Sequence, residues 1–95
     1  MSTTTITSET LCADLRGEAN HRADMHTLNP ERAQEYRALE FEVISEHEFR
    51  GTNVGGQGTG LLSLVLDEVE GKNPVEFHEH WEGGGAVTIY WVQTA

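Results

Sequence analysis

The sequence predicts one small α+β domain, with one or two N-terminal helices packed on an antiparallel sheet of about four strands. Three observations predict it: helix-capping and helix-periodic segments open the chain, alternating apolar and polar residues fill much of the rest, and the turns between the expected strands are short. A chain of 95 residues can build one modest core and no second one. We therefore expect a single domain over residues 1–95, with its strands joined as a meander.

The first expected helix begins near Ser8, which can cap it, and runs towards Met25. Gly17 lies inside this segment and costs about 1 kcal/mol relative to alanine, which argues against an unbroken helix. Residues 1–7 are small and polar, and we expect them to be flexible. Apolar side chains recur at every fourth position and predict one buried helix face: Leu11, Leu15, Ala19 and Ala23.

A second, short helix is predicted from Asn29 to about Arg37, because asparagine can cap a helix and Pro30 fits its first position. Residues 38–49 fit either a continued helix or a strand, and the period of two with Phe and β-branched side chains favours a strand. Its two faces would be apolar and acidic: Leu39, Phe41 and Val43 against Glu40, Glu42, Glu46 and Glu48.

The glycine-rich stretch 51–60 superficially resembles a phosphate-binding loop. It lacks the GxGxxG spacing and the Lys-Ser/Thr pair of such loops, so the sequence predicts a hairpin connection instead. Residues 61–69 then read as a second strand, with Val65 on its outer face. The inward side chains of that strand would be Leu62, Leu64 and Leu66.

Residues 74–82 carry the clearest alternation in the chain and predict a third strand. Val75, Phe77 and Trp81 would point inward, and Glu79 breaks the inward pattern, so we expect it near an edge or end of the sheet. The outward side chains would be Glu76, His78, His80 and Glu82.

A turn at residues 83–85 leads to a final strand, with Val87, Ile89 and Trp91 inward. The outer face of the sheet would mix apolar and acidic residues, among them Ile44, Tyr90 and Val92. Such a face can be a contact surface. The predicted core consists of Leu11, Leu15, Phe41, Val43, Leu62, Leu64, Leu66, Phe77, Trp81, Ile89 and Trp91.

The charge balance is strongly acidic, with 6 Lys and Arg against 16 Asp and Glu and a formal net charge of −10. This excess disfavours direct binding to nucleic acid or to an anionic membrane, and it attracts a basic protein surface. No transmembrane or signal segment is evident, so we expect a cytoplasmic protein. The single cysteine, Cys12, is expected to be a buried apolar side chain and not a reactive thiol.

Candidate chemistry is sparse. His78 and His80 would stand about 6.7 Å apart on one strand face and could converge on a metal, but no third ligand is identifiable. The Glu18–His21 spacing matches half of a di-iron motif, which needs a second such pair. Because no catalytic motif is found, we expect neither an enzyme nor a cofactor.

The leading hypothesis is a small, non-enzymatic binding or inhibitory protein that contacts a basic, nucleic-acid-binding surface of a partner protein. In size and charge the chain is similar to the acidic inhibitors that phages make against host defences, including anti-CRISPR proteins and DNA mimics. A metal- or small-molecule-binding protein centred on His78 and His80 is the alternative, and a homodimer through the outer face is a third. The expected partner-binding residues are Glu40, Glu42, Glu46, Glu48, Glu76, His78, His80, Glu82 and Tyr90.

Overall fold

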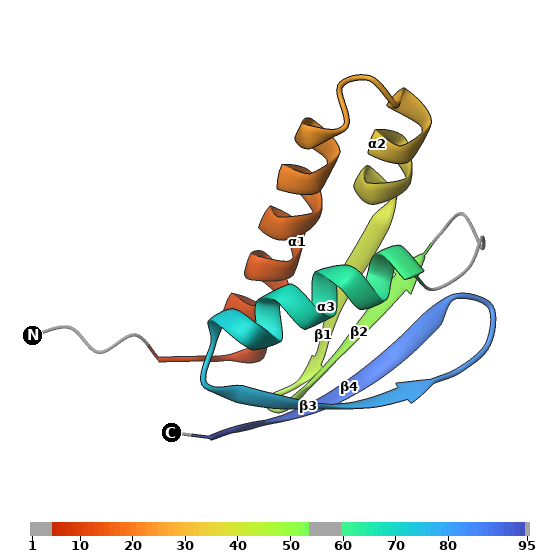
Figure 1. Cartoon of the computed structure of the whole chain (residues 1–95). Helices are drawn as coiled ribbons and strands as arrows, with labels where there is room; N and C mark the ends of the chain where they lie inside the picture. The colour runs from red at the N-terminus through yellow and green to blue at the C-terminus, as the bar shows by residue number, and fades with distance from the viewer. Residues whose placement is uncertain (1–4, 54–59, 95) are drawn as a thin grey trace, which may run out of the picture.

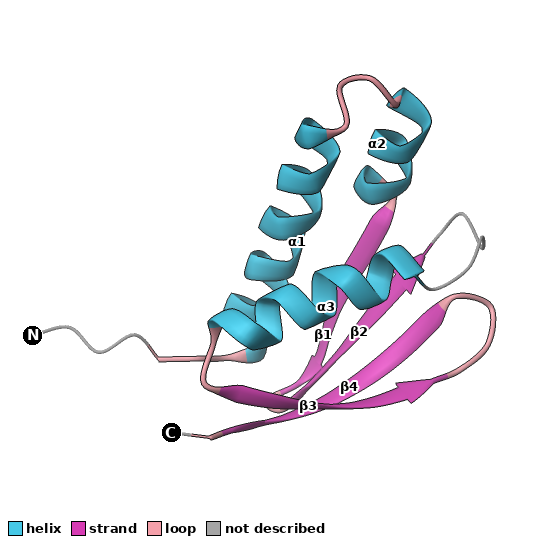
Figure 2. Cartoon of the chain, in the orientation of Figure 1, coloured by secondary structure: helices cyan, strands magenta, loops and turns pink. Residues whose placement is uncertain are grey.

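A computed structural model describes residues 5–53 and 60–94 and confirms the α+β class: helices pack on one face of a four-stranded antiparallel sheet (Figures 1 and 2). Residues 1–4 and most of the expected glycine-rich hairpin connection, residues 54–59, lie outside the described residues. The elements in chain order are α1 (Ser8–Met25), α2 (Pro30–Arg37), β1 (Leu39–Ser45), β2 (Glu48–Asn53), α3 (Gly60–Lys72), β3 (Val75–Trp81) and β4 (Ala86–Gln93).

The two N-terminal helices lie where the sequence predicts them, with one difference in capping. Thr7, and not Ser8, caps α1, since its side chain accepts a hydrogen bond from the Thr10 backbone N–H and the Thr10 side chain bonds back to the Thr7 N–H. Gly17 does not interrupt the helix. Asn29 caps α2 by accepting from the Arg32 N–H at 3.1 Å.

The predicted strand over residues 38–49 is wrong in extent. It is a hairpin in which β1 and β2 are joined by a tight turn at Glu46 and His47. Glutamates at alternating positions continue through this turn, so the strand period does not indicate the reversal. The turn also contains neither glycine nor proline, the residues that usually mark one.

The predicted strand over residues 61–69 is also wrong, because this segment belongs to helix α3. Leu64 is 47% exposed, whereas Val65, which we expected on an outer face, is fully buried. The apolar residues therefore follow a helical stripe: Leu61, Leu62, Val65, Leu66 and Val69. A short leucine-rich run fits both the strand period of two and the helix period of 3.6 residues. Packing against α1 and the sheet stabilises the helix.

The sheet order is β1-β2-β4-β3 and is not the predicted meander. After β2 the chain passes through α3 to the far edge of the sheet, and β4 returns between β2 and β3. Both neighbours of β4 run antiparallel to it, so β2 and β3 are parallel to each other. The edge strands are thus β1 and β3, and the edge position of β3 agrees with the prediction for Glu79.

The core lies between the helices and the sheet, and most of its predicted members are buried there. Phe41 and Trp81 are only partly buried, and Val43 is exposed because it lies on the edge strand β1. The fully buried residues that were absent from the predicted core include Leu39, Phe49, Val65, Val69 and Val87. None of the helices in the described part of the chain is long and apolar enough to cross a membrane.

Candidate protein-binding face

The face of the sheet opposite the helices carries the outward side chains of all four strands. Their chain neighbours, such as Phe49, Ile89 and Trp91, are buried on the helix side. We call this surface the open face; it consists of Glu40, Glu42, Glu48, Arg50, Thr52, Glu76, His78, His80, Glu82, Thr88, Tyr90 and Val92.

The strand register arranges these residues in rows. Glu42 pairs with Arg50, Arg50 with Thr88, and Thr88 with His80, so one row crosses all four strands. The next row is formed by Glu48, Tyr90 and His78. Segments that are far apart in the sequence therefore build one continuous surface.

The open face is dominated by glutamates, and Arg50 is its sole Lys or Arg. Arg50 Nη2 lies 3.8 Å from Glu82 Oε2, and the Thr88 hydroxyl donates to Glu82 Oε1 at 2.5 Å. The Thr88 hydrogen bond, with Arg50 and His80, outweighs desolvation and holds the pKa of Glu82 below its usual range. Glu82 is therefore ionised at neutral pH. Among the described residues, no Lys or Arg nitrogen lies within 4.0 Å of the carboxylates of Glu40, Glu42, Glu48 or Glu76.

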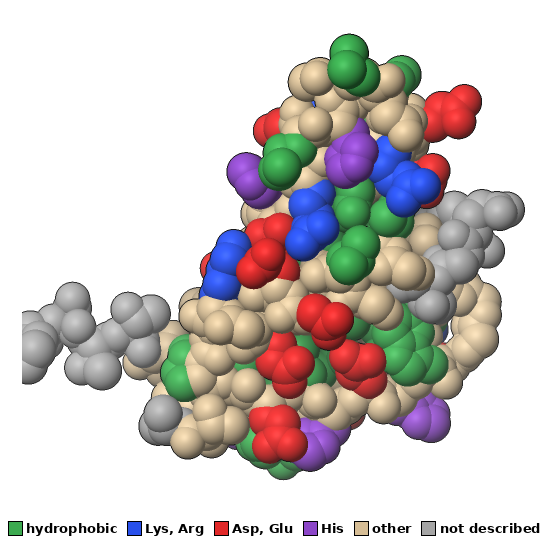
Figure 3. Space-filling model, viewed as in Figure 1, with side chains coloured by type: hydrophobic (Ala, Val, Ile, Leu, Met, Phe, Trp, Pro, Cys, Tyr) green, Lys and Arg blue, Asp and Glu red, His purple; other side chains and the backbone are tan. Residues whose placement is uncertain are grey.

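The basic residues lie mostly elsewhere. Of the six, Arg16, Arg22, Arg32 and Arg37 lie in α1 and α2. Figure 3 shows Lys and Arg side chains towards these two helices and acidic side chains gathered over α3 and the strands beside it. The negative charge is thus concentrated at the sheet end of the molecule.

Tyr90 supplies an aromatic centre to the open face. Its side chain is 50% exposed, and its ring centroid lies 6.3 Å from that of His47 and 6.3 Å from that of His78. Ile44, in the irregular part of β1, is also 50% exposed. An exposed tyrosine surrounded by charged groups is a composition typical of protein interfaces.

The structure brings together all the predicted partner-binding residues except Glu46, which lies in the β1–β2 turn. Arg50 on this face and His47 beside it were not among the predicted residues. The alternation from Glu48 onwards indicates Arg50 only if β2 is recognised as a separate strand. His47 approaches Tyr90 only through the fold, so no local signal could have found it.

Comparison with protein-family models, with curated proteins and with solved structures found no significant match.

The metal alternative has limited geometric support. His78 and His80 share the open face, and His78 Nε2 lies 3.9 Å from Glu76 Oε1. Within residues 5–53 and 60–94, no group of three His, Cys, Asp or Glu side chains is placed to hold a metal ion.

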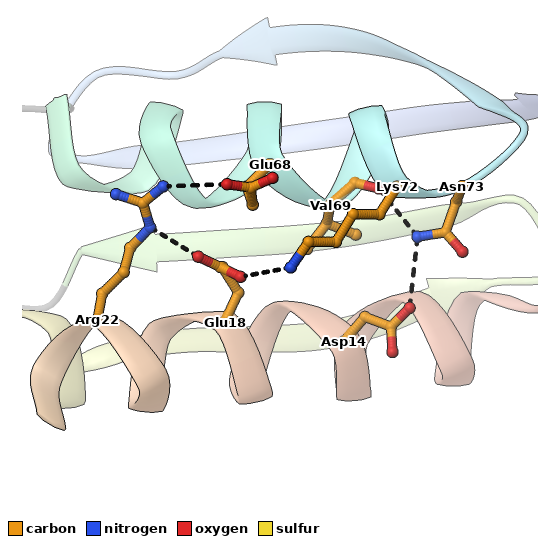
Figure 4. A network of polar contacts seen from close by, with 7 residues as sticks. All are labelled: Asp14, Glu18, Arg22, Glu68, Val69, Lys72 and Asn73. Atoms are coloured by element: carbon orange, nitrogen blue, oxygen red, sulfur yellow. Dashed lines mark hydrogen bonds and ion pairs between the residues drawn. The ribbon is translucent and has the colours of Figure 1, made fainter. Parts of the chain in front are cut away.

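Glu18, the carboxylate of the di-iron spacing, forms ion pairs with two basic side chains. Glu18 is 8% exposed, and its two oxygens bind Arg22 Nε at 2.8 Å and Lys72 Nζ at 3.0 Å. Asn73 continues this network to Asp14 (Figure 4). The network lies in a shallow hollow of about 470 Å³ and ties α1 to α3.

Proposed function

We propose that this protein is a non-enzymatic binding or inhibitory protein whose open face docks on a basic surface of a partner protein. One observation supports this proposal above all. Glutamates from three strands and from the segment after β3 lie together on one helix-free face, around the half-exposed Tyr90. Complementary charge steers such an encounter and raises the association rate, while a central tyrosine can anchor the complex.

The partner surface that fits best is one that otherwise holds nucleic acid. Glu40 and Glu42 stand about 6.7 Å apart along β1, which is within about a factor of two of the spacing of the phosphates on one DNA strand. Arg50 interrupts this pattern, which supports charge-based obstruction of a basic groove and not a close copy of a duplex. Inhibition and a cytoplasmic location are parts of the same proposal.

A pair of charge-reversed variants tests this function. Glu40→Lys/Glu42→Lys alters the open face, whereas Glu31→Lys/Glu35→Lys makes the same change in net charge on the exposed surface of α2. We expect capture of a nucleic-acid-binding complex from lysate to weaken with salt and to fall about tenfold or more only in the first variant. Thermal melting of both variants controls for folding.

Two results would contradict the proposal. Equal losses in the two variants would mean that the partner responds to net charge and not to the open face. The absence of any salt-sensitive partner would remove the basis for a docking function.

The alternative function, metal or small-molecule binding, is favoured only by the position of His78 and His80 on the same face of β3. Metal analysis of the purified protein tests it. Stoichiometric zinc, iron or nickel that is lost in a His78→Ala/His80→Ala variant would replace the first proposal.

A further inference from the structure

Each edge of the sheet is bound by a charged side chain from a helix. On β1, the guanidinium of Arg16 from α1 donates to the Leu39 carbonyl and, at 3.1 Å, to the Tyr36 carbonyl just before the strand. On β3, the Glu70 carboxylate from α3 accepts from the Phe77 backbone N–H at 2.7 Å. Edge strands expose unpaired backbone groups and are the usual place where a further strand adds.

The register shows that the bound groups face the free edges. The Trp91 N–H donates to the His47 carbonyl, so the backbone of Trp91 faces β2. Phe77 is the antiparallel partner of Trp91, and its backbone groups therefore point away from β4. Glu70 thus binds the Phe77 N–H, a donor to which a strand added on β3 would have to form a hydrogen bond.

On β1, too, the bound backbone group faces the free edge. The Asn53 N–H donates to the Gly85 carbonyl at 2.7 Å, on the β4 side of the sheet. Asn53 pairs with Leu39, so the backbone groups of Leu39 point away from β2, towards Arg16. The guanidinium also lies over the Phe41 ring, with its central carbon 5.9 Å from the ring centroid.

Each edge has a second obstacle to strand addition. The β1–β2 register shifts between Val43 and Ser45, which disrupts the outer ladder of β1. On β3, Glu79 occupies a helix-side position, where its carboxylate accepts from the Trp81 indole N–H at 2.9 Å. A strand added there would partly bury this charge, at a cost in free energy.

We propose that Arg16 and Glu70 are edge guards: each occupies one free backbone group of an edge strand, the Leu39 carbonyl and the Phe77 N–H, and prevents a second copy of this chain from pairing edge to edge. The β3 edge is the more vulnerable of the two, since Val75, Phe77 and Trp81 alternate along it as in an aggregation-prone strand. This inference is independent of the proposed function. One consequence for docking is that a partner meets the open face and does not add a strand.

The test compares three variants of α3 by size-exclusion chromatography with light scattering over a range of concentrations. Glu70→Ala frees the Phe77 N–H, Glu70→Gln keeps an oxygen that can accept from it, and Glu68→Ala removes the same charge from a neighbouring position. We expect Glu70→Ala to self-associate about tenfold more strongly than Glu68→Ala, and Glu70→Gln and the wild type to stay monomeric. Equal association of Glu70→Ala and Glu68→Ala, or none in either, would overturn the proposal.

A second variant keeps the proposal testable if Glu70→Ala unfolds. Glu79 is exposed, so we expect Glu79→Val to preserve the fold while it completes an apolar row along the β3 edge. We expect Glu79→Val/Glu70→Gln to remain mainly monomeric, and its self-association would overturn the proposal whether or not Glu70→Ala folds. A wild-type protein that is itself a β3-edge dimer would also overturn the proposal.

Discussion

The indole Nε1 of Trp91 donates a 2.9 Å hydrogen bond to the Oγ of Ser8, 83 residues earlier in the chain. Ser8 in turn donates to the Glu46 carbonyl at 2.9 Å. Both Ser8 and Trp91 are almost fully buried. One hydroxyl therefore joins the start of α1, the β1–β2 turn and the central strand β4.

Replacing Ser8 by alanine removes both hydrogen bonds and leaves the Trp91 N–H buried without its partner. We expect the free energy of unfolding to fall by about 2 kcal/mol, because an unsatisfied buried donor costs more than a hydrogen bond contributes. Urea denaturation measures this. Ser45→Ala is the control, since the Ser45 hydroxyl is exposed and makes a 3.3 Å bond to Glu48; a similar loss in both variants would contradict the assigned role.

Glu18 should make stability depend on pH. Burial raises its pKa, but the hydrogen bonds and charges of Lys72 and Arg22 outweigh burial and hold the pKa below its ordinary value. The resulting stabilisation is fully present above the ordinary glutamate pKa of about 4.3 and is lost as the pH falls below it towards the lowered folded value.

We therefore expect Glu18→Gln to be less stable than the wild type at pH 7, by about 1 kcal/mol, with the difference shrinking in acid. Glu35→Gln on the exposed side of α2 should show neither effect. Melting curves between neutral and acidic pH compare the three proteins. A constant difference at every pH would show that the charge of Glu18 is not responsible.

The Cys12 thiol should be nearly unreactive. Burial, with a smaller contribution from Glu9, raises its pKa from 9.0 to about 11. The thiolate fraction at pH 8 is then about a hundredfold lower than for an ordinary thiol, so labelling by a disulfide reagent should be slowed by a similar factor. Full labelling in urea provides the control, and rapid labelling of the native protein would contradict the prediction.

Gly85 should resist replacement more than its neighbour Gly84. Both have positive φ angles, 82° and 71°, but a Cβ on Gly85 would lie 3.1 Å from the Asn53 carbonyl oxygen, whereas one on Gly84 would meet nothing within 4 Å. Gly84→Ala should cost about 1 kcal/mol from backbone strain alone, and Gly85→Ala about 2 kcal/mol or more. Equal costs by thermal melting would exclude the close approach as the cause.

Much of the fold could be predicted because its signals are local. The cap and proline at Asn29 and Pro30 define the start of α2, and alternation defines β3 and β4. The outward direction of Glu76, His78, His80 and Tyr90 follows from the same alternation, because successive side chains of a strand point to opposite faces.

The tertiary structure decided what these local signals leave open. The leucines of residues 61–66 suit a strand or a helix, and their burial against α1 and the sheet makes them helical. The turn at Glu46 and His47 has no local marker, so pairing of β1 with β2 is what reveals it. The central place of β4 depends on the path through α3, which no periodicity encodes.

The sequence by itself therefore determined which side chains of β1, β3 and β4 face outward and how acidic they are. Only the tertiary structure decided that they share one face, that Arg50 lies among them, and that Arg16 and Glu70 occupy the sheet edges. The physical reason is that side-chain direction follows from backbone geometry within one strand. The register between strands and the reach of a helix side chain depend on packing across the whole core.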